Sequence, residues 1–357
     1  MSPRFARLLL IACFVLSGMV MTREPRAAEL TIRGTISQAA WQVYCERFLD
    51  PSGRIIDDAN GNISHTEGQG YGLLLALAAD DRAGFERIWT FTQTEMLLRN
   101  DGLAVWKWLP TTPHVPDINN ASDGDLLIAY ALSLAGKAWS DDRYTQAATA
   151  LAEALGKATV IDERGESLLL PGASGFATKD RADGPVINLS YWIFEALPVM
   201  QQLAPDTDWQ ALARSGLDLL ASARFGDAGL PSEWISLHGG KAKPAAGFDP
   251  VFGYNALRIP FYLVRAGIDN PDLLAPFSAA WAGAGVNGLP IINVMTNQID
   301  ERLTDAGYRM LPALLACVRS GTKIPSELKS FTPTHYYPST LYLLSISYLA
   351  ERHAECL

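Results

Sequence analysis

The chain has 357 residues, of which 48% are hydrophobic and 19% are charged, and its formal net charge is −9. This composition is that of a folded protein, and the acidic balance argues against nucleic acid or an anionic membrane as its partner. Glycines and prolines are spread through many loops rather than gathered in one linker, which favours a single domain.

The N-terminal segment differs from the rest of the chain. Arg4 and Arg7 precede an apolar run at 8–21, and the small residues Ala27 and Ala28 follow after a short polar stretch. This pattern is typical of a secretory signal peptide, so we expect a leader at 1–28 and a single catalytic domain at 29–357. An uncleaved signal anchor is the alternative, although the apolar run is short for a membrane span. We therefore expect a secreted or periplasmic protein.

Three cysteines lie beyond the leader. Cys45, Cys317 and Cys356 are widely spaced and show no metal-binding or redox motif. One disulfide in an oxidising compartment and three separate thiols both remain open. We expect neither a metal nor a cofactor.

Helical spacing of apolar residues recurs along the remaining chain. It predicts helices at 35–48, 68–80, 83–98, 122–138, 142–157, 190–203, 207–224, 254–266, 271–283, 305–319, 324–329 and 339–352. Alternating strand patterns are rare, and a small hairpin of 168–170 with 186–187 is the best candidate.

Half of these helices begin with polar and aromatic residues and continue almost wholly apolar, whereas the helices between them are amphipathic. Apolar helices are buried and amphipathic ones cover them, so six alternations predict an all-α (α/α)6 barrel with a few short strands in loops. An irregular helical bundle is the alternative. The barrel would gather the polar helix starts on one face, at Glu67, Asp123, Asn188, Asn255, Tyr308 and Tyr336.

Two of these helix starts carry carboxylates among small residues. Glu67 lies in His-Thr-Glu-Gly-Gln-Gly-Tyr-Gly, and Asp123 lies in Ala-Ser-Asp-Gly-Asp. Two carboxylates presented in this way are the minimum for acid/base cleavage of a glycosidic bond. Helix capping or stabilisation by the helix dipole is the simpler interpretation of each. Asp123 is the better candidate for a cleft, and Asp125 suits a dipole or buried hydrogen-bond role.

Aromatic residues near these starts suit a sugar cleft. Trp106 and Trp108 lie in a proline-rich loop, where an indole can stack on the apolar face of a pyranose, although most tryptophans belong to the core. The predicted substrate-binding set comprises Tyr71, Trp106, Trp108, Asp125, Tyr191, Tyr254, Arg258, Tyr308 and Tyr336.

The segment at 121–132, Ala-Ser-Asp-Gly-Asp-Leu-Leu-Ile-Ala-Tyr-Ala-Leu, resembles the active-site signature of glycoside hydrolase family 8. The segment at 66–72, Thr-Glu-Gly-Gln-Gly-Tyr-Gly, is similar to that family's Ser-Glu-Gly-Gln-x-Tyr-Gly. The resemblance implies an inverting, endo-acting β-glycanase on an (α/α)6 barrel, usually an endo-1,4-β-glucanase and in some cases a periplasmic cellulase that accompanies bacterial cellulose synthesis. It implies that Glu67 is the proton donor and that Asp123 holds the sugar at the cleavage point or orients the water.

One departure concerns the general base. The segment at 253–260, Gly-Tyr-Asn-Ala-Leu-Arg-Ile-Pro, is similar to the family's Tyr-Asp-Ala-x-Arg-x-Pro, in which the Asp is the base. Asn255 is an amide and cannot accept the proton of water. Three hypotheses remain: another carboxylate (Asp123 or Asp249, then Asp183) is the base, Asn255 only positions the water, or the protein binds glucan without cutting it well.

The predicted function is therefore inverting hydrolysis of internal β-1,4-glucosidic bonds in cellulose or a related β-glucan. Xylan, lichenan and other mixed-linkage glucans, and chitosan are rival substrates. A weakly catalytic glucan-binding accessory of cellulose synthesis or export, and a sugar isomerase or lyase on the same fold, are rival functions. The expected partners are a β-glucan polysaccharide or oligosaccharide and the cellulose-synthesis machinery, and we expect a monomer.

Overall fold

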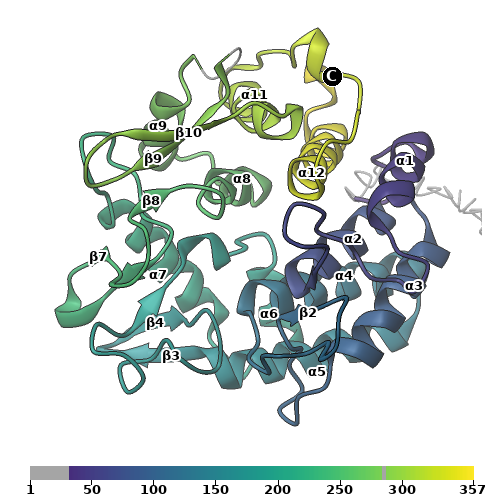
Figure 1. Cartoon of the computed structure of the whole chain (residues 1–357), viewed down its shortest axis with the longest axis horizontal. Coiled ribbons are helices and arrows are strands. Elements are labelled where there is room, and N and C mark those ends of the chain that lie inside the picture. Colours follow the sequence, from purple (N-terminus) through teal and green to yellow (C-terminus); the bar gives the residue numbers. More distant parts are fainter. Residues whose placement is uncertain (1–31, 284–286) are drawn as a thin grey trace, which may run out of the picture. The chain divides into compact units, whose positions relative to one another are not determined.

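The structure is a computed structural model that describes residues 32–283 and 287–357 (Figure 1). The predicted signal peptide and its boundary at Ala28 lie outside the described residues. Contacts between Cα atoms group Thr31–Leu357 into one unit. In the described part of the chain, no helix is both long enough and apolar enough to cross a membrane.

Inner helices form a closed ring in this unit (Figure 1). In the described chain they are α2 (Thr66–Ala78), α4 (Ser122–Trp139), the 3-10 turn Leu189–Tyr191 with α6 (Leu197–Leu203), α8 (Arg258–Arg265), α11 (Ala306–Ser320) and α12 (Tyr336–Arg352). Each of these six segments contacts the next, and α12 contacts α2. Most residues of α2, α4 and α12 are buried, as expected of helices that are apolar on all sides. The predicted (α/α)6 barrel is confirmed.

Amphipathic helices precede or follow the inner ones and cover them. They are α1 (Gln38–Phe48), α3 (Arg82–Phe91), α5 (Asp142–Thr159), α7 (Trp209–Ser222) and α9 (Pro271–Ala280). Side chains that accept a backbone N–H cap their first turns, for example Asp81 for α3 and Asp208 for α7. The caps fix where each outer helix starts and therefore where its apolar side meets the ring.

Several predicted helices are shorter than expected. The segment at 190–203 divides into a 3-10 turn and α6, because the Asn188 side chain accepts hydrogen bonds from Ser190 and closes a single tight turn. The segment at 254–257 is a turn and α8 begins only at Arg258. The end of the predicted 83–98 helix is a π-helix at Thr92–Met96, and 324–329 is reduced to the 3-10 turn Ser326–Leu328.

Short strands lie in the loops between helices. They are β1 (Ser64–His65), β2 (Lys107–Trp108), β3 (Val160–Glu163), β4 (Glu166–Leu169), β5 (Val186–Ile187), β6 (Ile235–Ser236), β7 (Lys243–Pro244), β8 (Val251–Phe252), β9 (Leu289–Asn293) and β10 (Ile299–Leu303). The predicted pairing of 168–170 with 186–187 is wrong, since β4 pairs with β3 and β5 pairs with β6. Positive φ angles at Arg164 and Gly165 form the tight two-residue turn that folds β4 back onto β3.

Glycines allow α2 and α4 to approach closely. A Cβ atom on Gly124 would lie 2.0 Å from Thr66 Oγ1, and one on Gly70 would lie 2.5 Å from Leu127 Cβ. These glycines therefore serve helix packing. The close packing of α2 against α4 brings Glu67 and Asp123 to the same place.

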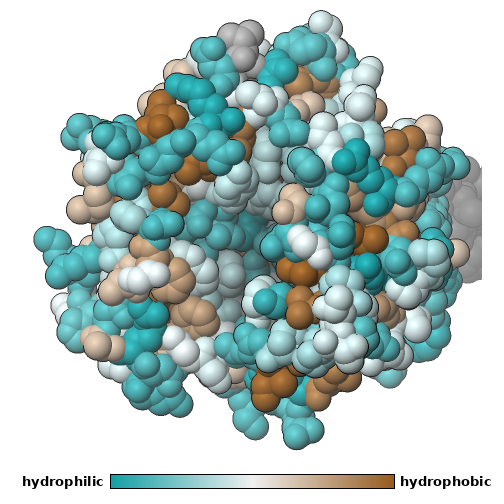
Figure 2. All heavy atoms as spheres, in the orientation of Figure 1, coloured by the Kyte–Doolittle hydropathy of each residue, from teal (hydrophilic) through white to brown (hydrophobic). Residues whose placement is uncertain are grey.

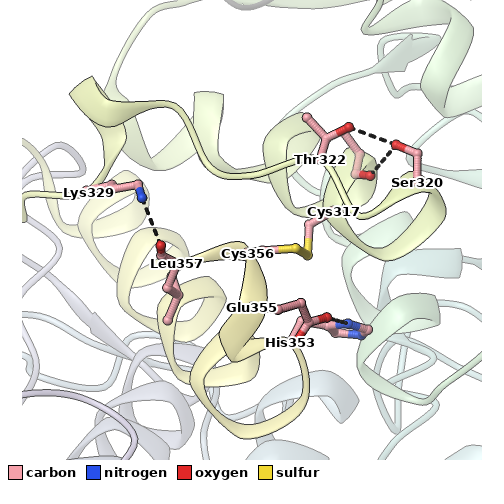
Figure 3. The surroundings of a disulfide bond; sticks show 9 residues. Cys317, Ser320, Thr322, Lys329, His353, Glu355, Cys356 and Leu357 are labelled. Atoms are coloured by element: carbon pink, nitrogen blue, oxygen red, sulfur yellow. Dashed lines mark hydrogen bonds and ion pairs between the residues drawn. A yellow bond between two sulfur atoms is a disulfide. The ribbon is translucent and has the colours of Figure 1, made fainter.

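A disulfide joins the end of the chain to the ring. Cys317 of α11 is bonded to Cys356, which lies in the short 3-10 turn after α12 (Figure 3). Two further contacts hold the same turn: Ile324 N–H donates to the Cys356 carbonyl, and Lys329 Nζ donates to the Leu357 carbonyl. Cys45 is a free thiol. The question that the sequence left open is thus answered by one disulfide.

Candidate active site

A cleft of about 780 Å³ lies at the N-terminal ends of the inner helices. Figure 2 shows the hollow, with hydrophilic residues at its floor, between α8 and α2 of Figure 1. Residues that start α2, α4, α11 and α12 and that precede α8 line it, together with the β9–β10 hairpin. Among them are Asp57, His65, Glu67, Trp106, Asp123, Tyr191, Tyr254, Asn255, Glu301, Asp305, Tyr308, His335 and Tyr336.

Glu67 lies in the first turn of α2, and its side chain is 16% exposed, in the cleft. His65 caps this helix, because its Nδ1 accepts the Gly68 N–H at 3.0 Å. The ring proton of His65 then lies on Nε2, which is 3.5 Å from Asp57 Oδ2. Burial lowers the pKa of His65. The hydrogen bond with Asp57 and the negative charge of Glu67 together raise it by more than burial lowers it, so the net shift of the pKa is upward. The cap fixes the backbone that carries Glu67.

Asp123 lies in the first turn of α4, one residue inside the helix. Its side chain is only 3% exposed. One oxygen, Oδ1, accepts the Gly124 N–H at 2.8 Å, and the other, Oδ2, lies 3.2 Å from Arg258 Nη1. Burial, opposed by Arg258 and reinforced by Glu67, raises the pKa of Asp123 to about 7.

Arg258 is fully buried and connects the two carboxylates. Its Nη1 donates to both Glu67 and Asp123, while its Nη2 donates to Asn255 Oδ1 at 2.9 Å and Ser190 Oγ at 3.2 Å. One buried cation therefore faces two carboxylates, which is an incomplete charge balance in a region shielded from water. The sequence predicted that Arg258 binds substrate, but its complete burial and these partners make it the group that positions the acids.

Glu233 contacts Asn255 and was missed by the sequence analysis. Its Oε1 accepts the Asn255 backbone N–H at 2.7 Å, and its Oε2 accepts the Asn255 side-chain Nδ2–H at 3.1 Å. Burial raises the pKa of Glu233, although the hydrogen bonds from Asn255 oppose this shift. Glu233 precedes β6 and does not start a helix, so helical periodicity gave no signal for it.

The other carboxylates proposed from the sequence lie elsewhere. Asp249 is exposed and does not line the cleft. Asp183 pairs with Arg181 at 2.8 Å and accepts the Ala246 N–H at 2.8 Å. Asp125 is fully buried and accepts hydrogen bonds from Ala104 N–H and Asn120 Nδ2–H, which agrees with its predicted buried role and keeps it from contact with a ligand.

The predicted aromatic residues separate into two groups. Trp106 lines the cleft, whereas the Trp108 ring stacks on His114 with 4.5 Å between ring centroids and an interplanar angle of 3°. Tyr71 is buried below the cleft, 3.5 Å from Arg258 Nη1. The structure brings the remaining four predicted tyrosines to the cleft: Tyr191, Tyr254, Tyr308 and Tyr336.

Tyr336 lines the cleft, and its buried hydroxyl has no hydrogen-bond partner within the described chain. In that same part of the chain, no three or more metal-ligating side chains come together in a cluster. A cleft with two acids, a buried arginine and tyrosine walls is the equipment of a glycoside hydrolase.

Comparison with known proteins agrees with this class. The sequence profile of the Glycosyl hydrolases family 8 matches residues 21–351, so the chain belongs to family 8 of the glycosyl hydrolases. An endoglucanase of Cellulomonas uda is 39% identical over 284 residues, which cover 78% of this chain and 76% of that protein. A probable endoglucanase of Novacetimonas hansenii is 38% identical over 253 residues, covering 70% of this chain and 73% of that one.

Solved structures share the fold. The family 8 endoglucanase Cel10 from Klebsiella pneumoniae superposes with a TM-score of 0.79 at 37% identity, covering 88% of this chain and 99% of that one. The endo-β-1,4-glucanase CMCax from Acetobacter xylinum has a TM-score of 0.80 at 33% identity, covering 90% and 99%.

Proposed function

We propose that this protein is an endo-1,4-β-glucanase that hydrolyses internal β-1,4-glucosidic bonds of cellulose or a related β-glucan with inversion. The observation that carries the proposal is the placement of Glu67 and Asp123 on one buried arginine in an open cleft. Family membership and the endoglucanase names of its relatives support the substrate class. An open cleft accepts the middle of a polymer, which endo cleavage requires.

Glu67 is the proton donor in this proposal. It is the partly exposed acid of the pair, and it protonates the glycosidic oxygen of the leaving chain. Asp123, whose pKa is about 7, donates a hydrogen bond to a sugar hydroxyl in its protonated form and accepts one in its ionised form. Arg258 keeps both carboxyl groups in place. Because each is held before the substrate arrives, little reorganisation is needed at the moment of reaction.

Trp106 and the tyrosines of the cleft supply stacking surfaces for the sugar rings. The Trp106 indole Nε1–H donates to Asp117 at 2.8 Å, so its ring orientation is fixed in advance. A rigid aromatic wall binds a sugar with less loss of conformational entropy than a mobile one.

The experiment measures reducing ends and viscosity with carboxymethylcellulose, lichenan, xylan and chitosan, for the wild type and Glu67→Gln. We expect a fast loss of viscosity with few reducing ends on the β-1,4-glucan, abolished in Glu67→Gln. Binding of glucan without turnover in both proteins would instead identify a glucan-binding accessory, and preferred cleavage of xylan or chitosan would change the substrate class.

We also propose that the protein acts outside the cytoplasm, in the periplasm or medium. The leader pattern at 1–28 and the Cys317–Cys356 disulfide support this location, because disulfides persist in oxidising compartments. The test compares fractions of cells that express the full chain with cells that express a chain lacking 1–28; activity confined to the cytoplasm in both would contradict it. A link to cellulose synthesis and a monomeric state stay predictions.

A further inference from the structure

Inverting hydrolysis needs a second carboxyl group that accepts a proton from the attacking water. The cleft-lining residue at the expected position is Asn255, and its amide oxygen already accepts a hydrogen bond from Arg258 Nη2 at 2.9 Å. An amide in this state can hold a water molecule through its second Nδ2–H but does not act as a base. Another group must take the proton.

The carboxylates suggested by the sequence do not suit this task. Asp123 and the proposed acid Glu67 are both held by Arg258 Nη1, whereas the base of an inverting enzyme must be separated from the acid by room for a water. Asp249 is exposed outside the cleft, and Asp183 is occupied by Arg181 and a backbone N–H. Asp57, Glu301 and Asp305 also line the cleft, where Asp57 lies against His65 and Glu301 accepts a hydrogen bond from Tyr254. Glu233 is partly buried behind the cleft-lining Asn255 and contacts it through both carboxylate oxygens, which singles it out as the carboxylate tied to the amide at the expected base position.

The geometry ties Glu233 to the catalytic centre. A chain of hydrogen bonds runs from Glu67 through Arg258 to Asn255 and ends at Glu233, which puts the two glutamates at its opposite ends. Room for the carboxylate comes from Gly253, where a Cβ atom would lie 2.9 Å from Glu233 Oε1. Each carboxylate oxygen accepts one hydrogen bond from Asn255 and keeps further acceptor capacity for a water.

We propose that Glu233 is the general base of this enzyme and that Asn255 positions the water which Glu233 deprotonates. The inference rests on the proposed glucanase function. The water oxygen bonds to the anomeric carbon while the glycosidic C–O bond breaks; the water gives one proton to Glu233, and Glu67 gives its proton to the leaving oxygen. Proton exchange with solvent then restores both glutamates. Burial raises the pKa of Glu233, which strengthens it as a proton acceptor.

In this chain the residue at the expected base position is an Asn, and a carboxylate, Glu233, lies directly against it. An aspartate at 255 would place a second carboxylate against Glu233, because the Nδ2–Oε2 separation is 3.1 Å. Like charges this close repel, so we expect Asn255→Asp alone to add no activity. The double variant Glu233→Gln/Asn255→Asp removes the repulsion and returns a carboxylate to the cleft.

The test uses cellohexaose with the wild type, Glu233→Gln and the double variant, with Asp183→Asn as the matched control. We expect Glu233→Gln to lose about 10²–10⁴-fold in kcat while its Kd for cellohexaose and its Tm stay near the wild type. Azide, which needs no base, should restore turnover and give an α-glycosyl azide by single inversion. The double variant should recover part of the activity on water, and Asp183→Asn should keep it.

The outcomes distinguish a Glu233 that acts as the general base from a Glu233 that only holds Asn255 in place. An active wild type and a Glu233→Gln variant with unchanged kcat would overturn the inference while leaving the proposed function intact. A loss in Glu233→Gln that azide does not rescue and that comes with weaker binding of cellohexaose would also overturn it, since Glu233 would then only hold Asn255. A wild type without turnover would refute the proposed function itself.

Discussion

Arg258 offers a direct test of how the two acids are held. Replacing it by Met leaves the Asp123 side chain, which is 3% exposed, without its cation. Removing one partner of a buried ion pair costs about 3–5 kcal/mol, so we expect Arg258→Met to lose that much unfolding free energy at pH 8. Glu67, which is 16% exposed, can be rehydrated and adds less to the loss.

The loss should depend on pH. Without Arg258 the pKa of Asp123, already about 7 in the folded protein, rises further above its value of 3.8 in the unfolded chain. A raised folded-state pKa contributes stability below pH 4, and this contribution is lost as the pH rises through the folded-state value. At pH 5 Asp123 is protonated, and the penalty falls to the lost hydrogen bonds, roughly 1.5–3 kcal/mol.

Urea unfolding at pH 5 and pH 8 measures both values. The double variant Arg258→Met/Asp123→Asn is the control, because without the carboxylate the difference between the two pH values should shrink. An Arg258→Met protein as stable as the wild type at pH 8, or one with the same loss at both pH values, would refute the argument that Arg258 compensates the charge of Asp123.

Further predictions concern the disulfide and the tryptophans. The separation of 39 residues gives a loop-closure contribution of roughly 4 kcal/mol, so Cys356→Ser should lower the unfolding free energy by up to this amount, with Cys45→Ser as control; equal urea midpoints for the two variants would contradict it. Trp106→Ala should raise KM for cellohexaose about fivefold, the equivalent of about 1 kcal/mol, with kcat nearly unchanged. Trp108→Ala should instead lower Tm, because Trp108 stacks on His114; a change only in KM would refute this distinction.

The sequence predicted the barrel because its helices have two distinct patterns. Segments that are apolar on all sides, such as 66–78 and 122–139, can only be buried, and the amphipathic segments between them can only be covers. Helix ends were less predictable. The Asn188 side chain closes a single turn inside a predicted helix, and a local hydrogen bond of this kind leaves no trace in the apolar spacing.

The candidate site was predictable where a motif starts a helix, as for Glu67 and Asp123. Glu233 lies in an irregular loop, and its contact with Asn255 joins segments 22 residues apart, so no local pattern reveals it. The tryptophans differ for a related reason: Trp106 and Trp108 are two residues apart in one loop, yet only the fold decides that His114 covers the second.

Anomer-resolved NMR of cellohexaose tests the central claim most directly, with the wild type and Glu67→Gln as the two samples. We expect the α-anomer to form first at the new reducing ends in the wild type and no product to form with Glu67→Gln. An initial β-anomer, or undiminished cleavage by Glu67→Gln, would contradict inverting hydrolysis with Glu67 as the proton donor.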